Sequence, residues 1–144
     1  MSNHKIYPCL WFNNQAQEAV THYCSIFKTA KVLNDQGMMV IFELNDTKFM
    51  ALNGGPAFQF NESISMVLNC EGQEEVDYYW NALTADGGTE SQCGWLKDKF
   101  GVSWQIVPVE LMQTVGNADP EIREYAFQAM LKMKKIEIDK LYKK

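Results

Sequence analysis

The sequence predicts an α+β fold built from two tandem β-α-β-β-β repeats with an added C-terminal helix. The pattern Q-E-x-V-x-x-Y occurs twice, starting at Gln17 and again 56 positions later at Gln73. Asn13 and Asn69 precede the two patterns at the same offset. A repeat of roughly 50 residues is too small to bury both a sheet and a helix well by itself, so the two copies are expected to fold together.

The first repeat begins with an apolar, aromatic-rich stretch at 6–12 that predicts a strand, although Pro8 favours an edge or a strand start. Asn13 and Asn14 resemble a capping pair before a helix at 15–27. Three further strands are predicted at 31–33, 38–44 and 48–52, with turns between them. The helix is expected to bury one face made of Ala16, Ala19, Val20, Tyr23 and Phe27.

The second repeat restarts the pattern with a strand at 63–68 and a helix at 73–83. Asp86-Gly87-Gly88 follows, and glycine suits the left-handed end of a helix. Strands are predicted at 89–92, 93–97 and 102–107. The last two form a hairpin around a connection that starts with Asp98 and ends with Gly101, because Asp caps such a turn and Gly accepts a positive φ.

The remaining residues lie outside the repeat. A short helix is predicted at 109–115, and Asp119-Pro120 is typical of the start of a second helix. Methionines and small apolar residues then recur at helical spacing, which indicates core or a subunit contact. We therefore expect one domain over 1–144, with repeat one at about 5–53, repeat two at about 62–108 and an extension at about 109–144.

The charge of the chain argues against two classes of partner. The net charge is −5, and residues 132–144 hold six of the thirteen basic groups but only two of the eighteen acidic ones. The rest of the chain is therefore strongly acidic and should repel nucleic acid. The lysines of the extension suit the C-terminal end of a helix, so we expect no membrane partner. The sequence also lacks an apolar signal core and metal-type cysteine spacing, which favours a cytoplasmic protein with reduced thiols.

Strand alternation predicts which side chains face a cavity between the repeats. Tyr7, Cys9 and Trp11 share one face of the first strand, and Ser103, Gln105 and Val107 share one face of the last. A mostly apolar wall with a few hydrogen-bonding groups is typical of a small-molecule pocket. The alternative is that these side chains fill the sheet interior or a dimer contact. The predicted binding residues are Tyr7, Trp11, Met50, Ser63, Ser65 and Gln105.

Several stretches carry a resemblance to a known family. They are residues 52–56, 60–63, 73–80, 86–88, 93–108 and 129–136, and the hairpin is the most specific of them. Together the chain resembles the PhnB-like family, often labelled 3-demethylubiquinone-9 3-methyltransferase. That family belongs to the vicinal oxygen chelate superfamily, with glyoxalase I, extradiol dioxygenases, and fosfomycin- and bleomycin-resistance proteins. The resemblance implies a glyoxalase-like fold, while fold does not fix activity.

The resemblance also implies where a metal would bind. The superfamily's metal-dependent members use four strand residues, which correspond here to Tyr7, Phe49 or Met50, Ser63 and Gln105. Of these, only Gln105 is an ordinary ligand for a divalent metal. The two histidines do not help, because His4 is near the N-terminus and His22 is on a predicted helix. We therefore expect no metal site and no cofactor.

The methyltransferase label meets a similar difficulty. A doubly wound methyltransferase would need a Gly-rich loop between a strand and a helix. The Gly54-Gly55 and Gly87-Gly88 pairs instead lie between strands or after a helix.

The leading hypothesis is a metal-free binding protein or cryptic enzyme for a small, partly apolar molecule, and its catalytic residues are unknown. Two alternatives stay open: a metal-dependent lyase or dioxygenase with a non-canonical site, and a dimerising structural module. We expect a homodimer in each case, because the C-terminal helix offers a contact surface.

Overall fold

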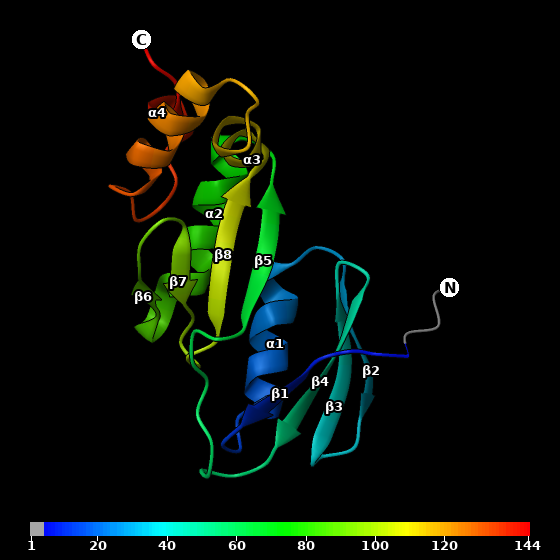
Figure 1. The fold of residues 1–144 in the computed structure, drawn as a ribbon. Helices are drawn as coiled ribbons and strands as arrows, with labels where there is room; N and C mark the ends of the chain where they lie inside the picture. The colour runs from blue at the N-terminus through cyan, green and yellow to red at the C-terminus, as the bar shows by residue number, and fades with distance from the viewer. Residues whose placement is uncertain (1–4) are drawn as a thin grey trace. The chain divides into compact units, whose positions relative to one another are not determined.

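The computed structural model describes residues 5–144 (Figure 1). The chain divides into two compact units, the first ending at Phe60 and the second starting at Asn61. Each unit holds a four-stranded sheet with a helix packed on one face, so the predicted α+β class is confirmed. The grouping of residues 1–144 into a single domain stays a prediction. Within the described residues, every helix is too short or too polar to serve as a transmembrane span.

The first unit has its strands in the order β1-β4-β3-β2. β1 pairs in parallel with β4, and the other neighbours are antiparallel. Helix α1 packs against β3 and β4 (Figure 1). The elements are β1 (Cys9–Phe12), α1 (Ala16–Ile26), β2 (Ala30–Asp35), β3 (Met39–Leu44) and β4 (Thr47–Asn53).

The core of the first unit lies between α1 and the sheet. The predicted helix face is buried, and Tyr23 stacks on Phe42 with ring centroids 6.4 Å apart. Phe42 in turn stacks on Phe49 at 5.4 Å. These aromatic pairs add to the area that they remove from water. The predicted capping pair is wrong in detail, because the first helical N–H, that of Ala16, donates to the side chain of Asn53 at the end of β4.

The second unit repeats this arrangement, with strand order β5-β8-β7-β6 and β5 parallel to β8. β5 starts 56 residues after β1, and α2 starts 56 residues after α1, which confirms the predicted repeat. The elements are β5 (Ser65–Cys70), α2 (Gly72–Thr84), η1 (Ala85–Gly87), β6 (Thr89–Glu90), β7 (Trp95–Lys97) and β8 (Ser103–Pro108).

The predicted hairpin joins β7 to β8, and Asp98 organises its connection. The carboxylate is buried and accepts N–H groups from Phe100, Val102 and the Trp104 indole, all within 3.0 Å. Gly101 takes a φ of +92°, as the turn requires. Trp104 is thereby fixed in the core beneath α2, and its neighbour Gln105 is directed to the opposite face of the sheet.

The extension folds onto the second unit as α3 (Val109–Val115), α4 (Pro120–Met130) and the short helix η2 (Ile138–Leu141). α4 starts as predicted, with the Asp119 carboxylate accepting the N–H of Glu121 and Pro120 in the first turn. Met133 of the predicted methionine stripe is buried in a small core. That core consists of Leu111, Ala126, Met133, Ile136 and Leu141.

Candidate functional site

Each sheet has one face covered by its helix and one face that the helix does not cover, which we call the open face. In β1, Leu10 and Phe12 are buried on the covered side, so Tyr7, Cys9 and Trp11 belong to the open side. In β4, Phe49 is buried, which places Met50 on the open face. Of the two residues that could correspond to the superfamily's ligand position on this strand, Met50 is therefore the one on the open face. It lies in register with Cys9 on one side and Ile41 on the other.

Trp11 is held in place by the segment that follows β4. Its indole N–H donates to the carbonyl of Gly55 at 2.9 Å, and its ring meets Phe58 edge-on at 5.0 Å. Gly54 lies against the ring so closely that an added Cβ would come within 2.3 Å of it. Because the polar atom of Trp11 is already engaged, this side chain can offer a ligand only apolar ring surface.

Tyr7 precedes β1 instead of belonging to it, and is partly buried. The Lys48 ammonium lies 4.4 Å from the centroid of its ring, a cation–π distance. Lys48 was not among the predicted site residues, although its place two positions before Met50 on β4 is a signal for the same face. It adds a positive charge to this face, directly opposite Glu43 in the β3–β4 register.

Cys9 is a second residue of this face that the site prediction left out, although the same alternation signals it. Its side chain is exposed, and partial burial of the thiol raises the Cys9 pKa above its ordinary value. The thiol is therefore mostly protonated near neutral pH and has little nucleophilic character.

In the second unit, Ser65 and Gln105 are in direct contact. The Gln105 side-chain amide donates to Ser65 Oγ at 2.9 Å across the parallel β5–β8 pair. This leaves the Gln105 carbonyl oxygen as an acceptor and the Ser65 hydroxyl proton as a donor, an arrangement suited to a ligand carbonyl or hydroxyl group. Val67 and Trp95 flank Gln105 in register, and Val67 is 58% exposed. The pair thus lies beside apolar surface.

Ser63 does not share this arrangement. The strand predicted to begin there begins at Ser65, and Ser63 lies in the turn before it. Its hydroxyl and its backbone N–H both donate to the side-chain oxygen of Asn61, at 2.6 and 3.0 Å. A local Asx-type turn therefore competes successfully with strand pairing at this position.

Ser103 and Lys97 are further residues of this face that sequence reasoning left out of the site. Ser103 pairs with Ser65 and Lys97, and its hydroxyl is buried with no hydrogen-bond partner among the described residues. Lys97 forms an ion pair with Glu62 at 3.2 Å, and the contact lowers the pKa of the Glu62 carboxyl. Ser103 is two positions before Gln105 on the same strand, and this alternation could have placed it in the candidate site.

The positions that would hold a metal have unsuitable donors. Of these four positions, only Tyr7 and Gln105 have a side-chain oxygen on or next to an open sheet face. Met50 offers a thioether, and the Ser63 hydroxyl is hydrogen-bonded to Asn61. No group of three or more His, Cys, Asp or Glu side chains in residues 5–144 is arranged to hold a metal ion. His22 is on α1, and His4 lies outside the described residues. The donor set does not fit the divalent metal that the superfamily resemblance implies.

The comparison with known proteins identifies the family. Residues 4–107 match the family model described as 3-demethylubiquinone-9 3-methyltransferase. The chain belongs to this family. The match ends before α3, so the extension lies outside the matched region. No curated protein matches the chain.

Solved structures support the same placement. A PhnB protein from Bacillus cereus is 28% identical, with a TM-score of 0.67 over 74% of this chain and 100% of its own. A Pseudomonas aeruginosa protein is 22% identical, with a TM-score of 0.59 over 74% and 98%. The fosfomycin resistance protein FosX from Listeria monocytogenes, in complex with Mn(II) and sulfate, is 15% identical with a TM-score of 0.57 over 83% and 100%. This PhnB-like family member therefore shares its fold with these proteins, which confirms the predicted glyoxalase-like fold.

Proposed function

We propose that this PhnB-like protein binds a small, partly apolar organic molecule at the open face of a sheet. The observation that carries the proposal is the Ser65–Gln105 pair, which keeps one acceptor and one donor beside the exposed side chain of Val67. In the first unit, Trp11 and Met50 supply apolar surface, and Lys48 supplies a cation beside Tyr7. A few polar groups among apolar ones are what a small-molecule site requires.

The chemistry of these groups narrows the ligand class. A carbonyl or hydroxyl group would meet Ser65 and Gln105, whereas near Lys48 the facing Glu43 carboxylate offsets the attraction for an acidic group. The donor set does not favour a metal-dependent lyase or dioxygenase. The glycine pairs of the described residues do not support the methyltransferase activity in the family's name, because Gly54-Gly55 follows β4 and Gly87-Gly88 follows α2. Binding, with or without a reaction, is the function that these residues support best.

A thermal-shift screen tests the proposal. The panel contains simple phenols, bleomycin, and fosfomycin with and without Mn²⁺, the last chosen because FosX is a fosfomycin resistance protein crystallised with Mn(II). A ligand at 100 times its dissociation constant should raise the free energy of unfolding by about 2.7 kcal/mol. For any compound that binds, Gln105→Ala should weaken affinity about tenfold by removing one hydrogen-bonding partner.

Gln36→Ala is the matched control, since Gln36 is an exposed amide in the β2–β3 turn. It should bind as the parent chain does. Binding that is indifferent to Gln105→Ala, or a panel without any ligand, would count against the proposal.

We also propose that the chain forms a homodimer, for which the exposed apolar side chains of the extension are the supporting observation. Met112 on α3 is 61% exposed. Phe127 on α4 and Leu131 just after that helix are also exposed. Light scattering at several concentrations tests this proposal, and a monomer throughout the range would contradict it.

A further inference from the structure

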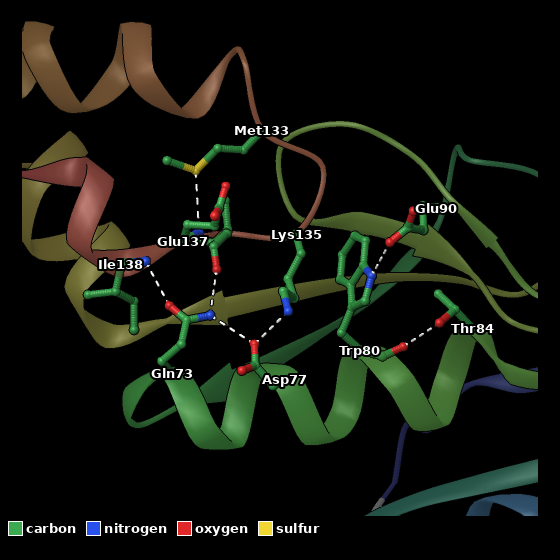
Figure 2. Close-up of polar contacts among 10 residues, drawn as sticks. Gln73, Asp77, Trp80, Thr84, Glu90, Met133, Lys135, Glu137 and Ile138 are labelled. Atoms are coloured by element: carbon green, nitrogen blue, oxygen red, sulfur yellow. Dashed lines mark hydrogen bonds and ion pairs between the residues drawn. The ribbon is translucent and has the colours of Figure 1, made fainter.

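Residues 133–138 of the extension, which we call the docking segment, run across the second unit between α2 and the β6–β7 loop (Figure 2). The loop binds the main chain of this segment at two points. The N–H of Cys93 donates to the carbonyl of Met133 at 2.8 Å, and the N–H of Gly94 donates to the carbonyl of Lys134 at 2.7 Å. Cys93 and Gly94 both have positive φ, and their successive N–H groups are the donors of these two hydrogen bonds.

On the other side of the docking segment, Gln73 of α2 binds its main chain (Figure 2). Its side-chain amide donates to the carbonyl of Ile136 at 2.9 Å, and its carbonyl accepts the N–H of Ile138 at 2.8 Å. A side-chain amide used in this way satisfies a main-chain acceptor and a main-chain donor two residues apart, much as a neighbouring strand would.

The repeat shows that binding a backbone carbonyl is a property of this position. Gln17, the counterpart of Gln73 in the first unit, donates to the carbonyl of Gly37 at 2.6 Å. In the first unit the bound carbonyl belongs to the β2–β3 turn. In the second unit it belongs to the extension, which lies outside the region matched by the family.

Side-chain contacts of the docking segment favour particular residues at two of its positions. The Lys135 ammonium lies 2.8 Å from Asp77, whereas the neighbouring Lys134 is exposed. Ile136 is fully buried against Gly94, where an added Cβ would lie 3.1 Å from the isoleucine Cγ1. Such close packing favours a branched apolar residue at this place and requires glycine opposite it.

Charge complements these contacts. A pocket of about 530 Å³ next to Lys135 includes Glu110, whose buried Oε1 has no hydrogen-bond partner among the described residues. The pocket also includes Asp77 of α2, together with Glu137 and Asp139 of the extension itself. Asp77 is therefore the acidic lining residue that the family-matched region contributes, and it pairs with Lys135. An opposite-charge pair between two surfaces favours their association and fixes their register.

We propose that the surface between Gln73 and the Cys93–Gly94 loop is a peptide-recognition site, occupied in cis by the docking segment. The ligand class is a short peptide in which a lysine is followed directly by a branched apolar residue, as in Lys135-Ile136. Gln73, Asp77 and the loop all lie within the region that the family model matches, whereas the docking segment lies outside that region. This site is independent of the small-molecule function proposed above.

The test uses the full chain, with a protease site inserted between Leu131 and Lys132. The protein is cut after folding, and a fluorescent synthetic peptide of residues 132–144 is added in excess. We expect the peptide to replace the cut fragment, giving a saturable rise in fluorescence anisotropy. A peptide with Lys135→Glu should bind about tenfold more weakly, because the substitution places a like charge beside Asp77. A peptide with Lys134→Glu is the matched control and should bind within about threefold of the parent.

The receptor side is tested in the same assay. Gln73→Ala should weaken peptide binding about tenfold or more, since two main-chain hydrogen bonds are lost. Gln36→Ala should leave binding unchanged. Failure of the peptide to bind a cut protein that keeps its circular dichroism spectrum would overturn the proposal. Equal binding of all peptides would do the same, because it would indicate adsorption of a basic peptide.

Hydrogen exchange in the uncut chain decides the question should the cut protein unfold. In the parent chain the Ile138 N–H donates to the Gln73 side chain. Gln73→Ala removes this hydrogen bond, so it should speed exchange of the Ile138 amide and leave the α1 amides unchanged. Unaltered protection of the Ile138 amide in Gln73→Ala would overturn the proposal in that case.

Discussion

The side chain of Asp98 shows how one residue can fix the β7–β8 hairpin. It is buried, and its two oxygens accept three N–H groups. Asp98→Ala leaves these donors unsatisfied and should lower the free energy of unfolding by about 3 kcal/mol or more. Asp98→Asn keeps one oxygen for the two backbone donors and should cost less. Urea denaturation measures both changes, and an equal loss in the two variants would contradict this assignment of roles.

Cys9 and Cys70 should differ sharply in reactivity. Cys70 is fully buried, and burial together with the Glu75 charge raises the pKa of its thiol to about 12. Cys9 is exposed, although its pKa is also raised. A disulfide reagent at pH 8 should therefore modify Cys9 about a hundredfold faster than Cys70, as peptide mapping would show. In denaturant the two rates should converge. Equal rates in the native chain would be inconsistent with the described core.

The contact between Trp11 and Gly54 links a candidate binding residue to the element that supports it. The Cβ of Gly54→Ala would lie 2.3 Å from the indole ring, so Trp11 must move. We expect a loss of about 2 kcal/mol in the free energy of unfolding, with a shift in tryptophan fluorescence. The double variant Trp11→Leu, Gly54→Ala should lose less than the sum of the single variants, because the clash disappears. Additive losses would show that the ring and the glycine do not interact.

At the scale of elements, the docking segment should be sensitive to acid. Hydrogen bonds from Lys135 and then from Gln73 lower the Asp77 pKa below its ordinary value. A carboxyl with a depressed folded pKa contributes stability above its unfolded pKa near 3.9, and this contribution is lost as the pH falls through the folded pKa. Docking should thus weaken only below about pH 4. The pair is partly exposed, so the effect should stay within about 1 kcal/mol.

Hydrogen exchange of the Gly94 and Ile138 amides between pH 5 and pH 3, corrected for intrinsic rates, measures this loss. The variant Asp77→Asn should be nearly insensitive over the same interval. A parent chain and a variant with the same pH response would contradict the role given to Asp77.

At the scale of the whole molecule, the predictable part of the fold is the part encoded by local pattern. The Q-E-x-V-x-x-Y repeat, the helix face around Tyr23 and the Asp98 turn each depend on residues close in sequence, and all are confirmed. The Asn53 cap of α1 and the Gln73 contacts with the docking segment join residues far apart in the chain. Nothing in a local window signals such pairings, so sequence reasoning missed them.

The candidate site shows the same difference between what a local pattern predicts and what it does not. Strand parity placed Trp11, Met50 and Gln105 on open sheet faces, since alternation is a local property. The same argument failed at Ser63, because the Asn61 side chain forms a turn where the pattern predicted a strand. Alternation also placed Ser103 and Lys48 on these faces, but it does not show that the Ser103 hydroxyl is buried without a partner or that Lys48 lies over the Tyr7 ring.

Metal content is the property of the purified chain that best separates the functional hypotheses. The positions that correspond to superfamily ligands offer a phenol, a thioether, a hydroxyl bonded to Asn61 and one amide. None of these except the amide oxygen of Gln105 is an ordinary ligand for a divalent metal, so a tight site lacks its donors. We expect no stoichiometric Zn, Ni, Mn or Fe by elemental analysis, and no change in melting temperature on adding Mn²⁺ or a chelator. About one equivalent of metal per chain would contradict this expectation and revive the metal-dependent alternative. Loss of that metal in Gln105→Ala, but not in Gln36→Ala, would then locate it at the open face of the second sheet.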